Sequence, residues 1–329
     1  MRVFIAGAGL IGSAIAWRLA QRGARVTVAD AGRFGSGASS AGAGMLSPGG
    51  EFDKPSVWFD LGLEAMRMYP SFVEELRAET GIPIDFARCG CLHFADPEQA
   101  RARAEFQCAR GLGVELRPEG LFYPEDAFVD PADLLRALRR ACESRNVALV
   151  ENQPVNRIES TDHDAAVIAA GAWSSQIAVT HRGAPVAMPP VKPIKGHLIG
   201  FDLEPGLLGA MLRRGHTYIL QRSNGFTVAG STEEDAGFNT EVNAETCKEI
   251  HRRAADLFPP LAAVEPAKCW TGLRPYAPEP HIRRVEGTNV WLAYGHFRNG
   301  ILLTPLTARI SSEICGAIPR FAGLKPRAD

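Results

Sequence analysis

The first 30 residues, MRVFIAGAGLIGSAIAWRLAQRGARVTVAD, constrain the fold of this chain more than any other stretch. Residues 2–6 and 25–29 are short apolar runs of the kind that form buried parallel strands. Between them, apolar side chains recur at helical spacing as far as Gly23, which predicts one helix. A strand, a helix and a second strand in this order predict a βαβ unit and therefore an α/β fold.

Three glycines in the turn after the first strand indicate a binding site for phosphate groups. Gly7, Gly9 and Gly12 form the pattern GxGxxG: the first makes the tight turn, the second lets the backbone approach a pyrophosphate, and the third allows close helix–strand packing. Asp30 ends the second strand, where a carboxylate accepts hydrogen bonds from ribose hydroxyls. The pattern predicts a dinucleotide site; a glycine-rich turn in some other α/β protein is the alternative.

A run of small residues follows the βαβ unit. Residues 35–45, GSGASSAGAGM, contain few bulky side chains, so the backbone can lie close against a flat ligand. Ser39 and Ser40 add hydroxyl groups suited to a phosphate. A disordered linker would have a similar composition, but linkers seldom come directly after such a unit.

Later segments predict a second domain interleaved with the first. Residues 164–171 form an apolar strand, which we expect to return to the parallel sheet; another core strand is the alternative. Between residues 186 and 262, short β-rich runs alternate with turns, which predicts an antiparallel sheet. Helical spacing predicts two helices within residues 56–79, separated at Pro70, and one helix from about residue 301 to 315.

The composition excludes several classes of function. The 329 residues carry a formal net charge of −1 with no long run of like charge, so nothing indicates nucleic acid or a membrane surface as a partner. Seven cysteines without zinc-type spacing predict buried reduced thiols and no metal site. The first apolar run is too short for a signal peptide, and no stretch is long enough to span a bilayer. We therefore expect a soluble, cytoplasmic protein.

Three segments late in the chain carry candidate chemistry. Tyr218 lies on a predicted half-buried strand, where its hydroxyl either faces a cavity or only packs. Arg274 precedes Pro275, which favours an extended backbone. Its apolar neighbours predict a partly buried guanidinium that needs an anion, either a bound carboxylate or an acidic side chain of the protein. Residues 295–301, GHFRNGI, repeat the order of strand, glycine turn and helix N-terminus, which stabilises negative charge.

These segments resemble a known family. GAGLIG, SSAGAGM, VIAAGAWS, GLRP and GHFRNGILLTP, in this order, are similar to the FAD-dependent D-amino-acid oxidase family, and within it to the glycine oxidases of the thiamin pathway. The resemblance covers nearly the whole chain. It implies an α/β fold in which a Rossmann-like FAD-binding domain (residues 1–85, 125–180 and 265–329) is interleaved with an antiparallel-sheet (α+β) substrate-binding domain (residues 86–124 and 181–264).

The resemblance also implies which residues contact FAD and which contact the substrate. Those expected at the cofactor are Gly7, Gly9, Leu10, Ile11, Gly12, Asp30, Ala31, Ser39, Ala43, Gly44, Met45, Val155, Gly171, His296, Phe297, Arg298, Asn299, Gly300, Ile301 and Leu302. Arg274 is expected to bind the substrate carboxylate, with Tyr218, Arg298 and Met45 as the other catalytic residues. No residue is expected to bind a metal.

The implied reaction is oxidative deamination of glycine, sarcosine or a small D-amino acid. Hydride would pass from the α carbon to flavin N5, giving an imine, then a 2-oxo acid, and H2O2 with O2 as acceptor. The resemblance also implies self-association. Three alternatives stay open: a dehydrogenase that passes electrons to a carrier, a non-catalytic nucleotide-binding subunit, and an NAD-dependent dehydrogenase. The last would not require both residues 35–45 and the late GHFRNG segment.

Two departures from the family's pattern bear on this interpretation. Between Ser160 and Asp164 the chain nearly lacks a β-hairpin that the family usually has there. Glu233 stands where some glycine oxidases carry a methionine near the pocket. Its carboxylate would favour a basic or N-alkylated amine, or would point to solvent.

Overall fold

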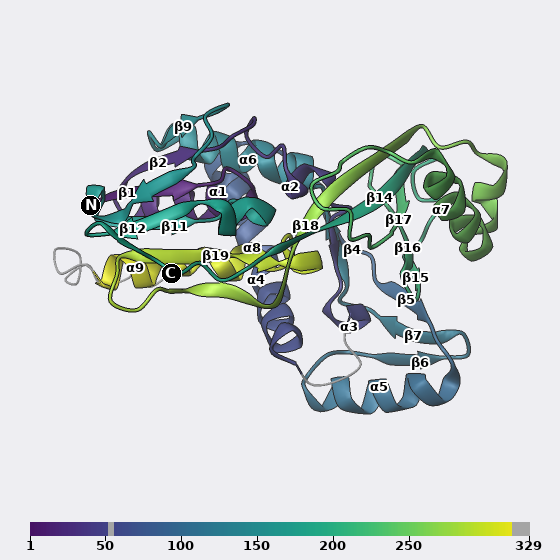
Figure 1. Cartoon of the computed structure of the whole chain (residues 1–329). Coiled ribbons are helices and arrows are strands. Elements are labelled where there is room, and N and C mark those ends of the chain that lie inside the picture. Colours follow the sequence, from purple (N-terminus) through teal and green to yellow (C-terminus); the bar gives the residue numbers. More distant parts are fainter. Residues whose placement is uncertain (52–55, 318–329) are drawn as a thin grey trace.

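The computed structural model describes residues 1–51 and 56–317, and its largest element is one sheet of thirteen strands that runs through two lobes (Figure 1). The strands of this sheet, from edge to edge, are β6 (Glu115–Arg117), β7 (Gly120–Tyr123), β5 (Cys91–Phe94), β15 (Met211–Arg214), β16 (Thr217–Gln221), β17 (Phe226–Gly230), β14 (Lys192–Asp202), β18 (Lys268–Arg284), β19 (Val290–His296), β11 (Ala165–Ile168), β1 (Arg2–Ala6), β2 (Arg25–Ala29) and β9 (Ala148–Val150).

Two small sheets and a set of helices complete the described chain. The small sheets consist of β10 (Arg157–Glu159), β12 (Ala178–His181) and β13 (Ala184–Pro185), and of β3 (Met45–Leu46), β8 (Ala127–Val129) and β4 (Phe86–Arg88). The α-helices are α1 (Leu10–Gln21), α2 (Ala38–Ala41), α3 (Pro48–Glu51), α4 (Val57–Thr80), α5 (Pro97–Ala109), α6 (Pro131–Ser144), α7 (Ala244–Leu257), α8 (Thr304–Ala308) and α9 (Ile310–Ala317). The 3₁₀ turns are η1 (Ser160–Asp162), η2 (Gly171–Gln176), η3 (Pro259–Ala263) and η4 (Phe297–Asn299). None of the described helices is long and apolar enough to cross a membrane.

The first lobe contains the βαβ unit expected at the N-terminus. Strand β1 pairs in parallel with β2 on one side and with β11 on the other, and β19 extends the sheet beyond β11. The predicted return of residues 164–171 to the parallel sheet is therefore confirmed. Helices α1 and α6 pack together over this sheet, and their buried residues share one apolar core with β1 and β2 (Figure 1).

The second lobe is built on antiparallel pairing. Strands β14 and β17 pair antiparallel, as do β17 with β16 and β16 with β15. Helix α7 covers one face of these strands and buries Ile250, Ala254 and Leu257 against Ile199 and Ile219. The predicted fold class, an α/β lobe with a parallel βαβ sheet joined to an antiparallel-sheet lobe, is confirmed.

One long strand joins the two lobes. The first half of β18 pairs with β14 of the second lobe, and its second half pairs with β19 of the first lobe, with an irregular register between Tyr276 and His281. Because β18 belongs to both lobes, their sheets form one continuous surface. The division into residues 1–85, 125–180 and 265–329 against 86–124 and 181–264 stays a prediction.

Two helix predictions are wrong. Residues 57–80 form the single helix α4, with Pro70 inside it. Burial of Tyr69, Phe72 and Val73 around the proline outweighs the roughly 3 kcal/mol that an interior proline costs. The helix expected from residue 301 begins at Thr304 as α8, because Pro305 has no N–H and fits only in a first turn. Its helical pattern then breaks at Arg309 before α9.

We expect Gly12→Ala to destabilise the protein by about 2 kcal/mol or more, because the new Cβ would lie 2.0 Å from the carbonyl oxygen of Gly7, a backbone atom that cannot swing aside. Gly209→Ala is the matched control: a Cβ there meets nothing within 4 Å, so its effect should stay within about 0.5 kcal/mol. Chemical denaturation of both variants measures the difference, and equal stabilities would contradict the close helix–strand packing assigned to Gly12.

Candidate functional site

A cavity of about 550 Å³ opens at the carboxyl ends of β1, β2 and β11. Fourteen of the residues expected at the cofactor line it: Gly7, Gly9, Leu10, Ile11, Asp30, Ala31, Ser39, Val155, Gly171, His296, Phe297, Arg298, Gly300 and Ile301. They come from five separate parts of the chain. The fold therefore brings the N-terminal turn, the small-residue segment and the late GHFRNGI segment to one place.

The turn after β1 is held in a fixed shape. The carboxylate of Asp30 accepts hydrogen bonds from the backbone N–H groups of Ala8, at 2.7 Å, and Gly32, at 2.8 Å. Ser39 Oγ accepts from the N–H of Leu10 at 3.0 Å, and a Cβ on Gly9 would lie only 2.9 Å from that oxygen. Gly9 leaves bare backbone at the start of α1, where N–H groups and the helix dipole favour a phosphate.

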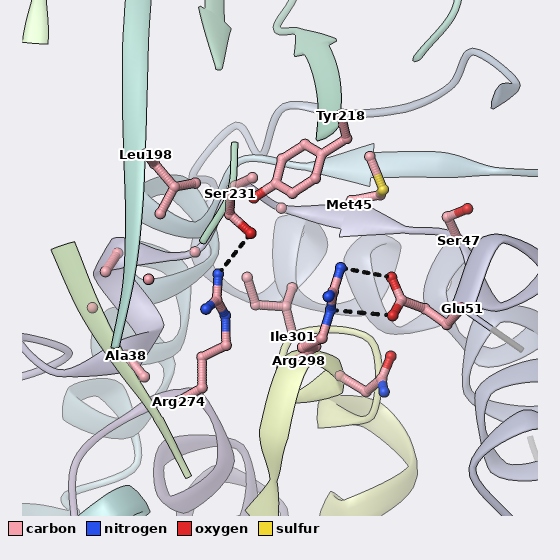
Figure 2. Close-up of a pocket in the computed structure, with 17 residues that line it drawn as sticks. Ala38, Met45, Ser47, Glu51, Leu198, Tyr218, Ser231, Arg274, Arg298 and Ile301 are labelled. Atoms are coloured by element: carbon pink, nitrogen blue, oxygen red, sulfur yellow. Dashed lines mark hydrogen bonds and ion pairs between the residues drawn. The ribbon is translucent and has the colours of Figure 1, made fainter. Parts of the chain in front are cut away.

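A smaller cavity of about 90 Å³ shares a wall with the first. Eight predicted residues line it: Ala43, Gly44, Met45, Tyr218, Arg274, Arg298, Asn299 and Ile301 (Figure 2). Arg274 and Arg298 also line the larger cavity, so they lie at the junction of the two. Two predicted residues line neither cavity: Gly12 packs against the Gly7 carbonyl, and Leu302 is buried in the apolar core.

Arg274 reaches into the small cavity from β18, across the bare backbone of Gly196 on β14. A Cβ on Gly196 would lie 2.1 Å from Arg274 Nη1, so only glycine leaves room for the guanidinium. Nη1 donates to the carbonyl oxygen of Thr232 at 2.8 Å and Nη2 donates to Ser231 Oγ at 3.0 Å. Among the described residues, no acidic side chain forms an ion pair with Arg274. Its orientation is thus set by neutral acceptors, and its charge is left without a counter-ion.

Tyr218 faces the same cavity from β16. Its side chain points toward Ser231 and the end of Arg274 (Figure 2), and the residue is 8% exposed. Burial raises the pKa of Tyr218, while the nearby Arg274 charge opposes the rise. The phenol therefore stays protonated at neutral pH and offers an O–H donor beside the guanidinium.

A second arginine in the cavity is fully paired. Arg298 Nε lies 3.2 Å from one oxygen of Glu51, Nη2 donates to the other at 3.4 Å, and Nη1 is bonded to Glu233. Glu51 is also paired with Arg213. Burial alone would raise the pKa of Glu51, but the charges of Arg213 and Arg298 outweigh it and hold that pKa below its ordinary value. Glu233 does not simply point to solvent, as one reading of the sequence had it.

The structure adds functional candidates that the sequence did not reveal: Ser47, Glu51, Leu198, Arg213, Ser231 and Thr232. Glu51 and Arg213 are 162 positions apart, and neither lies in a recognisable pattern. The only local signal is the glutamate at the end of the short SPGGE segment, residues 47–51, just after the predicted small-residue run.

A buried acid lies behind the small cavity. Asp126 is fully buried and accepts a hydrogen bond from Ser47, which lines the cavity. Burial raises the pKa of Asp126 to about 8, although the Ser47 hydrogen bond and the Arg213 charge both lower it and Glu51 adds to the rise. Below that pH the carboxyl is protonated, and it holds the β3–α3 segment that supplies Met45, Ser47 and Glu51.

His296 lines the large cavity and also makes a buried contact within the protein. Its ring is 2% exposed and Nε2 lies 3.0 Å from Thr307 Oγ1. Burial lowers the pKa of His296 to about 3, so the imidazole is neutral throughout the physiological range. Its contact with Thr307 joins the end of β19 to α8.

Comparison with known proteins agrees with this geometry. The profile of the family described as FAD dependent oxidoreductase matches residues 2–314. Glycine oxidase of Geobacillus kaustophilus is 31% identical over 351 residues, covering 95% of this chain and 92% of that protein, and glycine oxidase of Bacillus licheniformis is 30% identical over 345 residues, covering 94% and 91%. The crystal structure of the Geobacillus enzyme superposes with a TM-score of 0.87, covering 100% of this chain and 96% of that one, at 31% identity.

The fold and site thus define a flavin-dependent enzyme, and the chain belongs to the FAD dependent oxidoreductase family. Its own residues fit that cofactor. The large cavity begins at a glycine turn with bare backbone at a helix N-terminus, and it continues along small residues to the two arginines. A Cβ on Gly42 would lie 2.5 Å from the side chain of Ile301, so the wall at the junction is already closely packed.

We expect Asp126→Asn to flatten the pH dependence of stability. Between about pH 4, where an unfolded aspartate titrates, and about pH 8, the folded protein holds one more proton than the unfolded chain. This group therefore lowers the free energy of unfolding as pH rises through that window. The asparagine variant has no such proton, so its stability relative to wild type should increase from about pH 5 to about pH 8.

Urea denaturation of the FAD-saturated proteins at several pH values measures this difference. Asp235→Asn, which removes the same charge from an exposed position, is the control and should follow wild type. Parallel curves for Asp126→Asn and wild type would show that Asp126 is ionised in the folded protein.

Proposed function

We propose that the protein catalyses FAD-dependent oxidative deamination of a small amino acid: glycine, sarcosine or a small D-amino acid. The observation that supports this most directly is the half-buried Arg274, whose charge has no acidic partner among the described residues and whose guanidinium lies at the junction of the two cavities. A carboxylate is the anion that matches this planar fork. The glycine oxidases named above act on a substrate of this kind.

Arg274 binds and orients the substrate in this proposal. A guanidinium carries five N–H donors, and two of its nitrogens are held by Thr232 O and Ser231 Oγ. The remaining donors are free for a substrate carboxylate, and the Tyr218 hydroxyl lies ready to donate to the same group. Fixing the carboxylate at this point places the α carbon toward the larger cavity, since Arg274 borders both.

The size of the small cavity supports a small substrate. Its volume is about 90 Å³, and Met45, Leu198 and Tyr218 form its apolar walls. An amino acid with a hydrogen or a methyl group on its α carbon meets these walls without displacing them, whereas a bulky side chain would have to move buried residues.

Among the described residues, those that line the small cavity include no strong base. Its titratable lining groups are Glu51, Tyr218, Arg274 and Arg298, and Glu51 is bound in ion pairs that lower its pKa. In this proposal the amine loses its proton to solvent, and the protein contributes orientation and charge stabilisation. Bound FAD supplies the two-electron acceptor for the hydride that leaves the α carbon. The imine then leaves and hydrolyses to a 2-oxo acid, and O2 is the proposed final acceptor, giving H2O2.

In the same proposal the residues of the large cavity hold the cofactor. Gly7, Gly9 and Ser39 lie where the pyrophosphate would bind, and Asp30 lies where the ribose would. Each carboxylate oxygen of Asp30 accepts one backbone hydrogen bond and keeps a second lone pair for a hydroxyl. The segment from His296 to Ile301 would border the ring system, next to Arg274.

The experiment that tests the function is anaerobic. The purified protein is mixed with glycine, sarcosine, D-alanine, D-proline or L-proline while the flavin spectrum is recorded. We expect one of the first four to bleach the flavin, and readmitted air to restore the colour with release of H2O2. Restoration only after an artificial carrier is added would indicate a dehydrogenase, and no bleaching by any of these compounds would overturn the proposed substrate class.

Two substitutions should separate substrate binding from cofactor binding. Arg274→Ala should weaken the interaction with carboxylate substrates by roughly 2–5 kcal/mol while FAD stays bound, because it removes the charge that pairs with the carboxylate. Asp30→Ala should do the reverse and reduce FAD retention first, since it removes both the ribose acceptor and two hydrogen bonds that shape the turn. Each variant is the other's control. Loss of FAD from Arg274→Ala, or an unchanged FAD content in Asp30→Ala, would refute the assignment concerned.

A further inference from the structure

Charges around the small cavity nearly cancel. Three guanidinium groups, of Arg213, Arg274 and Arg298, meet two carboxylates, of Glu51 and Glu233, so among these groups one positive charge is left over. The ion pairs place that surplus on Arg274, because Arg298 and Arg213 are both bound to carboxylates. The charge balance among these groups therefore matches one bound anionic group.

Glu233 is the residue that completes this balance. Glu51 contacts the Nε and Nη2 side of Arg298, and among the described residues only Glu233 bonds Nη1. The Glu233 side chain is 35% exposed, whereas that of Arg298 is 13% exposed, so the glutamate covers the arginine from the rim of the pocket. Its carboxylate is already paired with Arg298, which argues against the idea that it serves as a counter-ion for a basic substrate.

The segment that carries Glu233 is held firmly. Thr232 O accepts from Arg274, and Thr232 Oγ1 accepts from the backbone N–H of His197 at 2.9 Å. On the other side of Glu233, Glu234 Oε1 lies 2.7 Å from Nδ1 of the buried His197. Because both neighbours are anchored to β14, the Glu233 side chain is directed at Arg298 by a fixed backbone.

We propose that Glu233 makes the pocket select substrates with a single anionic group, since it occupies the donor of Arg298 that would otherwise bind a second one. This inference rests on the proposed function, in which Arg274 takes the α-carboxylate. A substrate with a second carboxylate must either displace Glu233 from Arg298 or place two carboxylates side by side, and both cost binding free energy. Without Glu233, Nη1 of Arg298 is free to receive that second carboxylate.

Matched ligand pairs test the inference. Propionate and succinate, which cannot be oxidised at an α-amino carbon, are titrated into the FAD-bound protein, and the dissociation constants are read from the flavin difference spectrum. Sarcosine against N-(carboxymethyl)glycine, and D-alanine against D-aspartate, give the same comparison as ratios of kcat/KM. Wild type should favour the monoanion of each pair by about tenfold or more.

Glu233→Gln and Glu233→Met should narrow that preference by about tenfold, and FAD content should remain unchanged. Asp235→Asn is the matched control, because Asp235 is an exposed carboxylate on the same segment, and it should keep the wild-type preference. A preference within twofold of wild type in both Glu233 variants would overturn the inference. An equal effect of Asp235→Asn would overturn it too, by assigning the selection to the general charge of the rim.

The two proposals fail in different ways. If no amino acid reduces the flavin of the wild-type protein, the proposed function fails, and the propionate and succinate titrations still report on Glu233. If glycine or sarcosine is oxidised but the Glu233 variants discriminate as wild type does, only the selection by Glu233 fails.

Discussion

The pairing of β14 with β18 is the interaction on which the site depends. Nine consecutive positions pair antiparallel, from Lys192 opposite Tyr276 to Gly200 opposite Lys268. This pairing joins a nucleotide-binding sheet to an antiparallel one and fixes Arg274 at the seam. Within it Gly196 lies opposite Gly272, and the missing side chains leave space on both strands: Arg274 fills the space over Gly196, and Ala41 approaches Gly272. Both cavities border Arg274, and the small cavity is lined by Gly196 and Gly272.

The two arginines of the small cavity differ in their electrostatic surroundings. Arg274 is oriented by a carbonyl and a hydroxyl, which fix its direction without cancelling its charge. Arg298 is paired with the carboxylates of Glu51 and Glu233, which balance its charge, so it lines the cavity without an unpaired positive charge. Burial lowers the pKa of Arg274, and by the same reasoning it strengthens the attraction for any anion that enters the pocket.

Local sequence patterns correctly predicted the elements whose structure depends mainly on nearby residues. The glycine turn, the strands on either side of it, and the return of residues 165–168 to β1 follow from short apolar runs and from glycine spacing. The single helix α4 did not follow, because packing on both sides of Pro70 overrides its local preference. Strand β18 was not predicted as a strand: the sequence indicated only an extended backbone at Arg274, since the prolines at positions 275, 278 and 280 are typical of a turn-rich segment.

The site was predicted where a motif marks it and missed where only the fold assembles it. Arg274, Tyr218 and the segment from His296 to Ile301 lie in recognisable stretches, and the structure brings them to adjoining cavities. Glu51, Arg213 and Asp126 do not. They meet because α3, β15 and the turn before β8 converge behind the pocket, and no spacing in the sequence reports that convergence.

The segment of residues 231–234 holds Arg274 through the Thr232 carbonyl and the Ser231 hydroxyl, and it contacts Arg298 through the Glu233 side chain. A main-chain acceptor is kept when the side chain at its position is substituted, whereas a side-chain contact is lost or changed by one substitution. In the proposed function, residue 233 can therefore change while Arg274 keeps the two acceptors that orient it toward a substrate carboxylate. Under the two proposals, anchoring of a substrate and selection between substrates depend on different atoms of neighbouring residues, so a substitution at position 233 changes one without the other.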